Sequence, residues 1–160
     1  KLCVNSMANA IAGVTGLKSA ELREVESSRH ISIRIAAEVV QVALATGVDI
    51  QPISGVSPQM FVDAVSDESI MREVENILMS GAKQIGIGRP SLAQDLLKGR
   101  QIEVDYLNGY VSQKGSELGI STPVNDAIRD LAHRVARKEI EPSVENLSLI
   151  DVLSLPTDDN

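Results

Sequence analysis

The chain has 160 residues, of which 43% are hydrophobic, 23% charged and only 2% aromatic, and its formal net charge at pH 7 is −7. This balance excludes a disordered chain and is typical of a single globular domain with an aliphatic core. It also argues against a nucleic-acid partner, because phosphate binding needs clustered Lys and Arg and the sequence has no such cluster.

The sequence also limits the cellular setting. The single cysteine, Cys3, cannot form an internal disulfide, which favours the reducing cytoplasm. No apolar run approaches 18 residues, and the first residues lack the pattern of a signal peptide, so we expect no membrane partner. The chain begins at Lys1, without Met, inside an apolar periodic segment. We therefore expect it to be a fragment of a longer protein.

Helical periodicity and stop signals divide the first half of the chain. Gly13 and Gly16 are expected to end the first helix, and Ser57-Pro58 has the favoured order of a cap followed by proline. The helices that we predict here cover residues 2–12, 19–23, 28–46, 57–65 and 67–85. Ser19 is expected to cap the second of them, and Asp67 or Ser69 is expected to start the fifth.

The second half continues in the same way. We predict a loop at 86–90, a short helix from Ser91 that breaks at Gly99, a longer helix at 101–118, a helix at 123–138 opened by Thr122-Pro123, and short turns at 143–153. No alternating strand pattern appears, so the predicted fold is an all-α multi-helix bundle. It comprises one helical domain at 1–155 and a polar tail at 156–160.

The helix predicted at 28–46 is apolar almost all the way round, which places it in the middle of the bundle. It is buried either within one chain or across a homodimer. Its one acidic residue between positions 31 and 45 is Glu38, and a buried carboxylate needs a hydrogen-bond partner.

Polar groups gather in the stretch Ser91–Gly109, where Glu103 and Asp105 alternate with apolar residues. We expect these carboxylates to be half-buried beside the core and therefore to need partners.

Three other patterns favour structural roles. The stretch GIGRPS at 86–91 has no flanking strand, so a dinucleotide-binding loop is not expected. His30 and His133 lack ligands at zinc spacing, so we predict no metal site. Cys3 lies on an apolar helix and is expected to pack in the core rather than act as a nucleophile.

Asn5 and Asn9 share one helical face, because they are four residues apart. Such a pair either satisfies a buried polar contact or faces a ligand.

Four segments together resemble one known family. They are K-L-x-x-N-x-x-x-N at 1–9, EVVQVALATGV at 38–48, S-L-x-Q-D-x-x-x-G-R-x-x-E-x-D-Y-L-N-G at 91–109 and T-P-x-N at 122–125. The chain resembles the C-terminal domain of ketopantoate reductases (2-dehydropantoate 2-reductases), a helical domain like that of 6-phosphogluconate dehydrogenase-like reductases. In that family an N-terminal Rossmann domain binds NADPH, and that domain is absent from this chain.

The resemblance implies roles for individual residues. Lys1 matches the lysine that acts as general acid on the keto oxygen, and Glu103 matches the glutamate that holds the substrate and the lysine. Asn5, Asn9 and Ser91 match residues that bind the substrate. Asp105, Asn108 and Gly109 belong to the same motif, and we assign them packing roles.

The implied function is NADPH-dependent reduction of a small 2-keto acid, ketopantoate, to pantoate in pantothenate and coenzyme A biosynthesis. The partners are then that keto acid and the protein's own Rossmann domain, and the isolated chain is expected to be inactive. Two alternatives stay open. One is a non-catalytic helical dimerisation or interaction module, and the other is a related reductase for a different keto acid.

Overall fold

The computed structural model describes residues 1–80 and 103–153, the last three of them by their backbone alone. The predicted loop at 86–90, the short helix with Ser91 and the tail at 156–160 lie outside the described residues. Every element in the described ranges is a helix: α1 (Leu2–Thr15), α2 (Glu21–Glu24), α3 (Glu26–Ala45), α4 (Pro58–Ala64), α5 (Glu68–Ser80), η2 (Glu103–Tyr106), α7 (Asn108–Leu118), α8 (Pro123–Ala136), η3 (Val144–Leu147) and α9 (Ser148–Leu153). The all-α prediction is confirmed.

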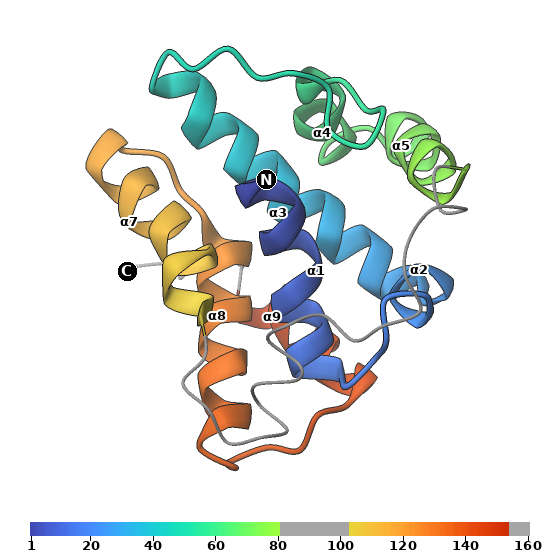
Figure 1. The fold of residues 1–160 in the computed structure, drawn as a ribbon, viewed down its shortest axis with the longest axis vertical. Coiled ribbons are helices and arrows are strands. Elements are labelled where there is room, and N and C mark those ends of the chain that lie inside the picture. The colour runs from blue at the N-terminus through green and yellow to red at the C-terminus, as the bar shows by residue number, and fades with distance from the viewer. Residues whose placement is uncertain (81–102, 154–160) are drawn as a thin grey trace.

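The long helix α3 runs through the middle of the molecule (Figure 1). It contacts α1, α4, α5, α7 and α8, while α1 in turn packs against α8. Ile33, Ile35 and Ala36 on α3 are completely buried. Most of the apolar surface of α3 is therefore buried within one copy of the chain, in agreement with its predicted central position, and Leu44 near its end is exposed.

Several helix ends follow the predicted signals. Ser57 caps α4 through a bond from the Met60 N–H to its Oγ, and Pro58 is the first helical residue. Asp67 caps α5, because its Oδ1 accepts hydrogen bonds from the N–H groups of Ser69 and Ile70. The Ser143–Leu153 segment forms the short turns expected of it.

Other predicted ends were wrong. The helix α1 was expected to end near residue 12, but it continues through the buried Gly13. It ends at Gly16, the second of the two predicted stop signals, whose φ of 76° is the left-handed conformation that glycine favours. Ser19 does not cap the next helix, which begins after Ala20. The helix α8 ends at Ala136, because Arg137 is its C-cap and Lys138 adopts a positive φ.

The helix predicted at 101–118 is divided in two within the described residues. The 3₁₀-helix η2 ends at Tyr106, and Leu107, with φ −106° and ψ −90°, lies outside the helical region before α7 begins. Asn108, the residue after this break, is completely buried. The prediction of one continuous helix was therefore wrong at this point.

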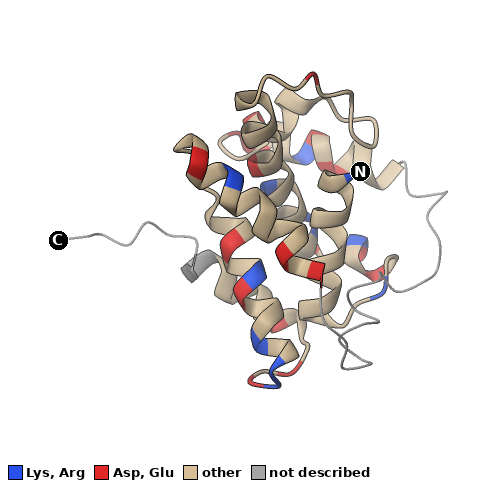
Figure 2. Cartoon of the chain, turned by 60° about the vertical axis from the view of Figure 1, so that its left-hand side comes forward, with Lys and Arg blue, Asp and Glu red and all other residues tan. Residues whose placement is uncertain are grey.

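Charged positions are spread over the surface rather than gathered by sign. Lys or Arg and Asp or Glu positions are interspersed along the helices of the described part of the chain (Figure 2). Among residues 1–80 and 103–153, none of the helices combines the length and the apolar character that crossing a bilayer requires.

Candidate active site

The first turns of α1 carry three of the predicted site residues. Lys1 is the N-cap of α1 and is exposed, and its carbonyl accepts a hydrogen bond from the N–H of Asn5 at 3.1 Å. Asn5 and Asn9 follow at helical spacing and are both half-buried. Because positions four apart share one face, Lys1, Asn5 and Asn9 form a polar strip along a helix that is otherwise largely buried.

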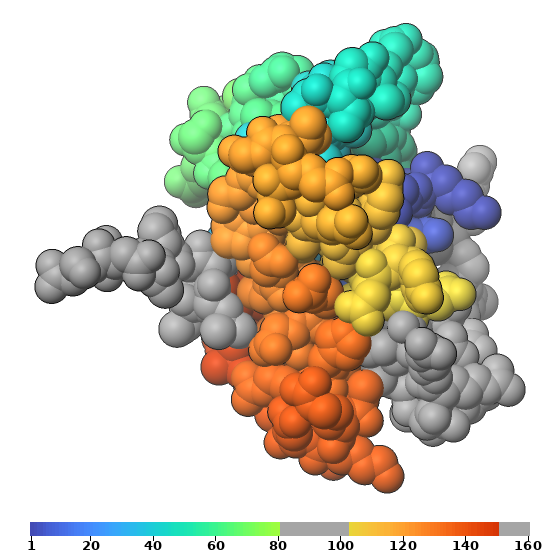
Figure 3. Space-filling view, turned by 90° about the vertical axis from the view of Figure 1, so that its left-hand side faces the viewer, coloured from blue at the N-terminus to red at the C-terminus, as the bar shows by residue number. Residues whose placement is uncertain are grey.

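The predicted acidic residue lies on a neighbouring element. Glu103 is the first residue of η2, and η2 contacts α1. In the space-filling view the start of α1 (dark blue) and the η2–α7 start (yellow) border one another on one face (Figure 3). Glu103 and Asp105 are exposed, so the prediction of half-buried carboxylates was wrong.

No ion pair joins Lys1 to Glu103 among the described residues. Ser91 lies outside the described residues, so its place beside this strip is a prediction. The neighbouring elements α1 and η2 nevertheless bring residues from opposite parts of the sequence to one region of the surface.

The remaining motif residues have distinct surroundings. The Oδ1 of Asp105 lies 2.9 Å from the Nε2 of His133, at hydrogen-bond distance, and the Nε of Arg129 approaches the same oxygen at 4.0 Å. Gly109 is buried, and a Cβ added there would lie 3.1 Å from the Cδ of Arg129. Gly109 therefore has the predicted packing role, whereas Asp105 has a surface one.

Beneath this region, the buried carboxylate of Glu38 binds the start of α8. Its two oxygens accept hydrogen bonds from the N–H groups of Val124 and Asn125, both at 2.9 Å. These are among the N–H groups that a helix start leaves without internal partners. Thr122, the N-cap, makes no side-chain cap bond, so the expected local cap is replaced by a residue from α3.

The network continues from Glu38 to α1. The Nδ2 of Asn125 donates to Glu38 Oε2 at 2.6 Å, and the Oδ1 of Asn125 accepts from the Nδ2 of Asn108 at 2.9 Å. Asn108 also donates to the carbonyl of Ser6 at 3.3 Å. The sequence indicated that Glu38 needs a partner, but it gave Asn108 only a packing role and linked neither residue to α1.

Burial raises the pKa of Glu38 above its ordinary value, because the charged form loses its hydration. The hydrogen bonds from Val124 and Asn125 oppose this increase, since they favour the carboxylate. Only 7% of Glu38 is exposed, so the cost of removing the charge from water decides the direction.

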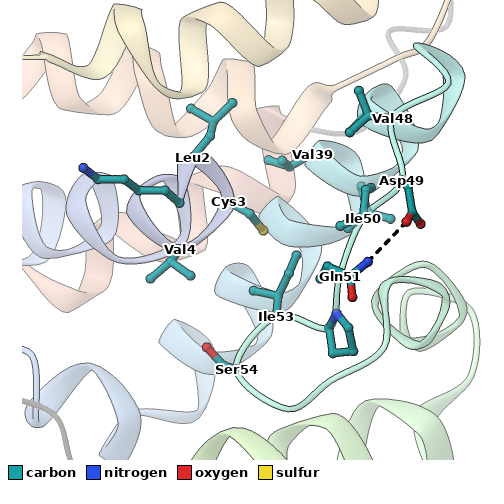
Figure 4. Close-up of a pocket in the computed structure, with 14 residues that line it drawn as sticks. Leu2, Cys3, Val4, Val39, Val48, Asp49, Ile50, Gln51, Ile53 and Ser54 are labelled. Carbon is teal, nitrogen blue, oxygen red and sulfur yellow. Dashed lines mark hydrogen bonds between the residues drawn. The ribbon is translucent and has the colours of Figure 1, made fainter.

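A second feature lies on the side of α1 that carries Cys3. A cavity of about 490 Å³ is bounded by the start of α1, the end of α3 and the following loop at 48–54 (Figure 4). Its lining is largely aliphatic, with Leu2, Cys3 and Ile53 among the residues around it, and it also includes Lys1. Burial raises the pKa of the Cys3 thiol to about 12, so Cys3 has the expected packing role rather than that of a nucleophile.

The two histidines lie next to single carboxylates. His133 meets Asp105, and the Nε2 of His30 is 3.5 Å from Glu75, which also binds Arg29. Within residues 1–80 and 103–153, no three His, Cys, Asp or Glu side chains are grouped closely enough to hold a metal ion.

Comparison with protein families shows which family this chain belongs to. The model described as "Ketopantoate reductase PanE/ApbA C terminal" matches residues 1–136. The chain belongs to this family. The match covers α1 to α8 and includes the polar strip, η2 and the buried network.

The chain has moderate sequence identity to curated members of this family. The chain is 29% identical over 134 residues to a 2-dehydropantoate 2-reductase of Lactococcus lactis, covering 83% of this chain and 38% of that protein. It is 28% identical over 131 residues to a 2-dehydropantoate 2-reductase of Pyrobaculum aerophilum, covering 82% of this chain and 40% of that protein. The chain thus spans about two fifths of the length of these relatives.

Solved structures share the same fold. A ketopantoate reductase from Ralstonia eutropha JMP134 matches with a TM-score of 0.64 and 26% identity, over 86% of this chain and 40% of that one. A D-mandelate dehydrogenase solved with NADH matches with a TM-score of 0.65 and 26% identity, over 86% of this chain and 46% of that one. The structural similarity therefore extends to a D-mandelate dehydrogenase as well as to a ketopantoate reductase.

Proposed function

We propose that this chain is the helical, substrate-binding part of an NADPH-dependent 2-dehydropantoate 2-reductase, which reduces ketopantoate to pantoate. The observation that carries the proposal is the family match over residues 1–136. The two curated relatives described above bear the same activity in their names. The polar strip of α1 beside η2 supplies residue types that suit this reaction.

Lys1 is the proposed general acid. Addition of a hydride to the keto carbon leaves negative charge on the carbonyl oxygen, and an ammonium aimed at that oxygen stabilises the charge and then donates a proton to it. The product is a 2-hydroxy acid, and the lysine leaves the step as a neutral amine. Glu103, on the adjacent η2, is proposed to hold the ammonium and the substrate in place.

Asn5 and Asn9 are proposed to orient the substrate. Their amide groups can both donate and accept hydrogen bonds, so they suit the carboxylate and hydroxyl groups of a small keto acid. Both lie on the face that begins at Lys1, which supports a shared role with the proposed proton donor. Ser91 is proposed to add a hydroxyl to this set.

The hydride requires a nicotinamide cofactor, and the D-mandelate dehydrogenase that shares this fold was solved with NADH. Dinucleotides bind at strand–turn–helix units, and residues 1–80 and 103–153 contain no strand beyond one isolated bridge. We therefore propose that an N-terminal Rossmann domain binds NADPH. The single cysteine is a buried free thiol, which agrees with a cytoplasmic enzyme.

The proposal is tested in the intact enzyme that carries this chain. We expect Lys1→Ala to lower kcat for ketopantoate by about 10²- to 10⁴-fold, the range that loss of a general acid typically causes. Glu103→Ala should lower kcat/KM strongly as well. Steady-state oxidation of NADPH, followed at its absorbance band, measures both effects.

Lys114→Ala and Glu117→Ala provide matched controls, because they remove the same residue types from an exposed ion pair on α7. Both controls should keep the wild-type rate. Full activity in both Lys1→Ala and Glu103→Ala would refute the assignment, and a wild-type enzyme that turns over no keto acid would favour the interaction module.

The similarity to D-mandelate dehydrogenase supports a second candidate, a reductase for another 2-keto acid. The two candidates differ in the group attached to the keto carbon, which is branched and hydroxylated in ketopantoate and aromatic in phenylglyoxylate. Comparison of kcat/KM for these two acids separates them. We expect ketopantoate to be preferred, and a preference for phenylglyoxylate would assign the second function.

A further inference from the structure

Asn108 connects the η2–α7 junction to the helix that carries the polar strip. It is the first residue of α7 and is completely buried. Its Nδ2 donates one hydrogen bond to the carbonyl of Ser6, which lies in α1 between Asn5 and Asn9. This bond fixes the start of α7 directly against the turn of α1 that carries the proposed substrate amides.

Asn108 is itself held in place from the opposite side. Its Nδ2 also donates to the Oδ1 of Asn125 at 2.9 Å, and Asn125 is anchored to Glu38 by a 2.6 Å bond and to the Ile35 carbonyl by a 3.4 Å bond. Asn108, Asn125 and Glu38 are all at least nine-tenths buried. A continuous chain of buried hydrogen bonds thus runs from α3 through α8 and α7 to α1.

This polar arrangement is less stable than apolar packing at the same positions would be. The Oδ1 of Asn108 and the hydroxyl of Ser6 are buried without a hydrogen-bond partner among the described residues. An apolar pair at these positions would avoid that cost. The amide of Asn108 instead fixes the orientation of the start of α7, because its two hydrogen bonds, to Asn125 and to the Ser6 carbonyl, form together in one arrangement.

We infer that Asn108 and Asn125 are positioning residues that hold the η2–α7 junction, with Glu103, at a fixed distance from the polar strip of α1. The inference rests on the proposed function. Glu103 lies five residues before Asn108 on the same short connection, so a shift of the junction moves Glu103 relative to Lys1 and Asn5. A misplacement of about 1 Å in such a site can reduce the rate by about 10²-fold.

The test compares Asn108→Ala with Asn146→Ala in the intact enzyme. Asn146 is a matched control, because its Nδ2 also donates to an α1 carbonyl, that of Val14, but at the far end of the helix. We expect Asn108→Ala to lower kcat/KM for the keto acid at least tenfold while KM for NADPH changes less than twofold. Asn146→Ala should lower the melting temperature and leave KM for both substrates unchanged.

Coupling between the two proposed residues gives an independent readout. Because Asn108 and Asn125 share one hydrogen bond, the double variant Asn108→Ala/Asn125→Ala should lose little more activity than the worse single variant. If Asn108→Ala does not fold, Asn108→Ser retains a shorter donor and should show the same change in the keto-acid kcat/KM at smaller amplitude.

The outcomes separate the two claims. If the wild-type enzyme is active and the Asn108 variants keep its kcat/KM for the keto acid, the positioning role alone is overturned. It is also overturned if Asn146→Ala lowers this kcat/KM as much as Asn108→Ala does. Additive losses in the double variant also overturn it. A wild-type enzyme that reduces no 2-keto acid overturns the proposed function, and the positioning role falls with it.

Discussion

At the level of single residues, Glu38 shows how a charged side chain is accommodated in an aliphatic core. It is 7% exposed and accepts hydrogen bonds from two backbone N–H groups and from the amide of Asn125. These bonds satisfy the polar groups at the start of α8, whose burial without partners would be costly. Burial nevertheless dominates the ionisation of the carboxyl, and its pKa is raised.

The raised pKa of Glu38 predicts how stability depends on pH. Between the ordinary value of about 4.5 and the raised pKa, the folded protein binds more protons than the unfolded chain. The contribution of Glu38 to the free energy of unfolding should therefore be fully present below pH 4.5 and should be lost as the pH rises through the raised pKa. Urea unfolding of the wild type and of Glu38→Gln, measured across this pH range, isolates the contribution of Glu38 to the free energy of unfolding. The stability of the wild type relative to Glu38→Gln should fall as the pH rises, and a relative stability of the wild type that rises with pH would contradict the prediction.

At the level of the elements, the contact between α7 and the start of α8 depends on a glycine. Gly115 is buried in α7, and a Cβ added there would lie 2.7 Å from the Ile120 carbonyl oxygen and 2.8 Å from the Cγ2 of Thr122. One of these atoms belongs to the backbone, so the neighbouring segment would have to shift. The glycine therefore allows the connection after α7 to fold back closely onto the helix.

We expect Gly115→Ala to destabilise the protein by about 2 kcal/mol, the usual cost of overpacking, although alanine favours helix formation. Chemical denaturation measures the change. Ser116→Ala, at the neighbouring exposed position, is the control and should change the free energy of unfolding by less than about 0.5 kcal/mol. A Gly115→Ala variant as stable as the wild type would contradict the prediction that these close contacts resist a methyl group.

The elements also show which features a sequence can predict. Ser57 and Pro58 act on residues three or fewer positions away, so their pattern predicted the start of α4 correctly. Thr122 and Pro123 have the same pattern, but the cap of α8 comes from Glu38. The break at Leu107 was missed for the same reason, since contacts of Asn108 with distant residues accompany it. Local signals are visible in a sequence, whereas a partner supplied by another helix is not.

For the candidate site, the sequence motifs predicted Lys1, Asn5, Asn9, Ser91 and Glu103. The four that the structure describes lie at the neighbouring elements α1 and η2. The relation between these elements could not be predicted. It depends on the buried contacts of Asn108, whose neighbours in the sequence give no sign of Ser6 or Asn125.

At the level of the whole molecule, the chain corresponds to about two fifths of the length of its curated relatives. If the cofactor domain is separate, residues 1–160 alone should show negligible turnover and no measurable binding of NADPH. Activity assays and calorimetric titration of the isolated chain and of the intact enzyme provide the comparison. Saturable NADPH binding by the isolated chain would show that the helices hold the cofactor themselves.

The carboxylate that caps α8 also has a consequence for folding. Glu38 lies 86 residues before Val124, so the start of α8 acquires its cap only after distant parts of the chain have met. A nascent α8 lacks this stabilisation, and short helices are marginal without tertiary support. Formation of α8 is thereby tied to the docking of α3, and the two halves of the chain are expected to unfold together in one cooperative transition rather than helix by helix.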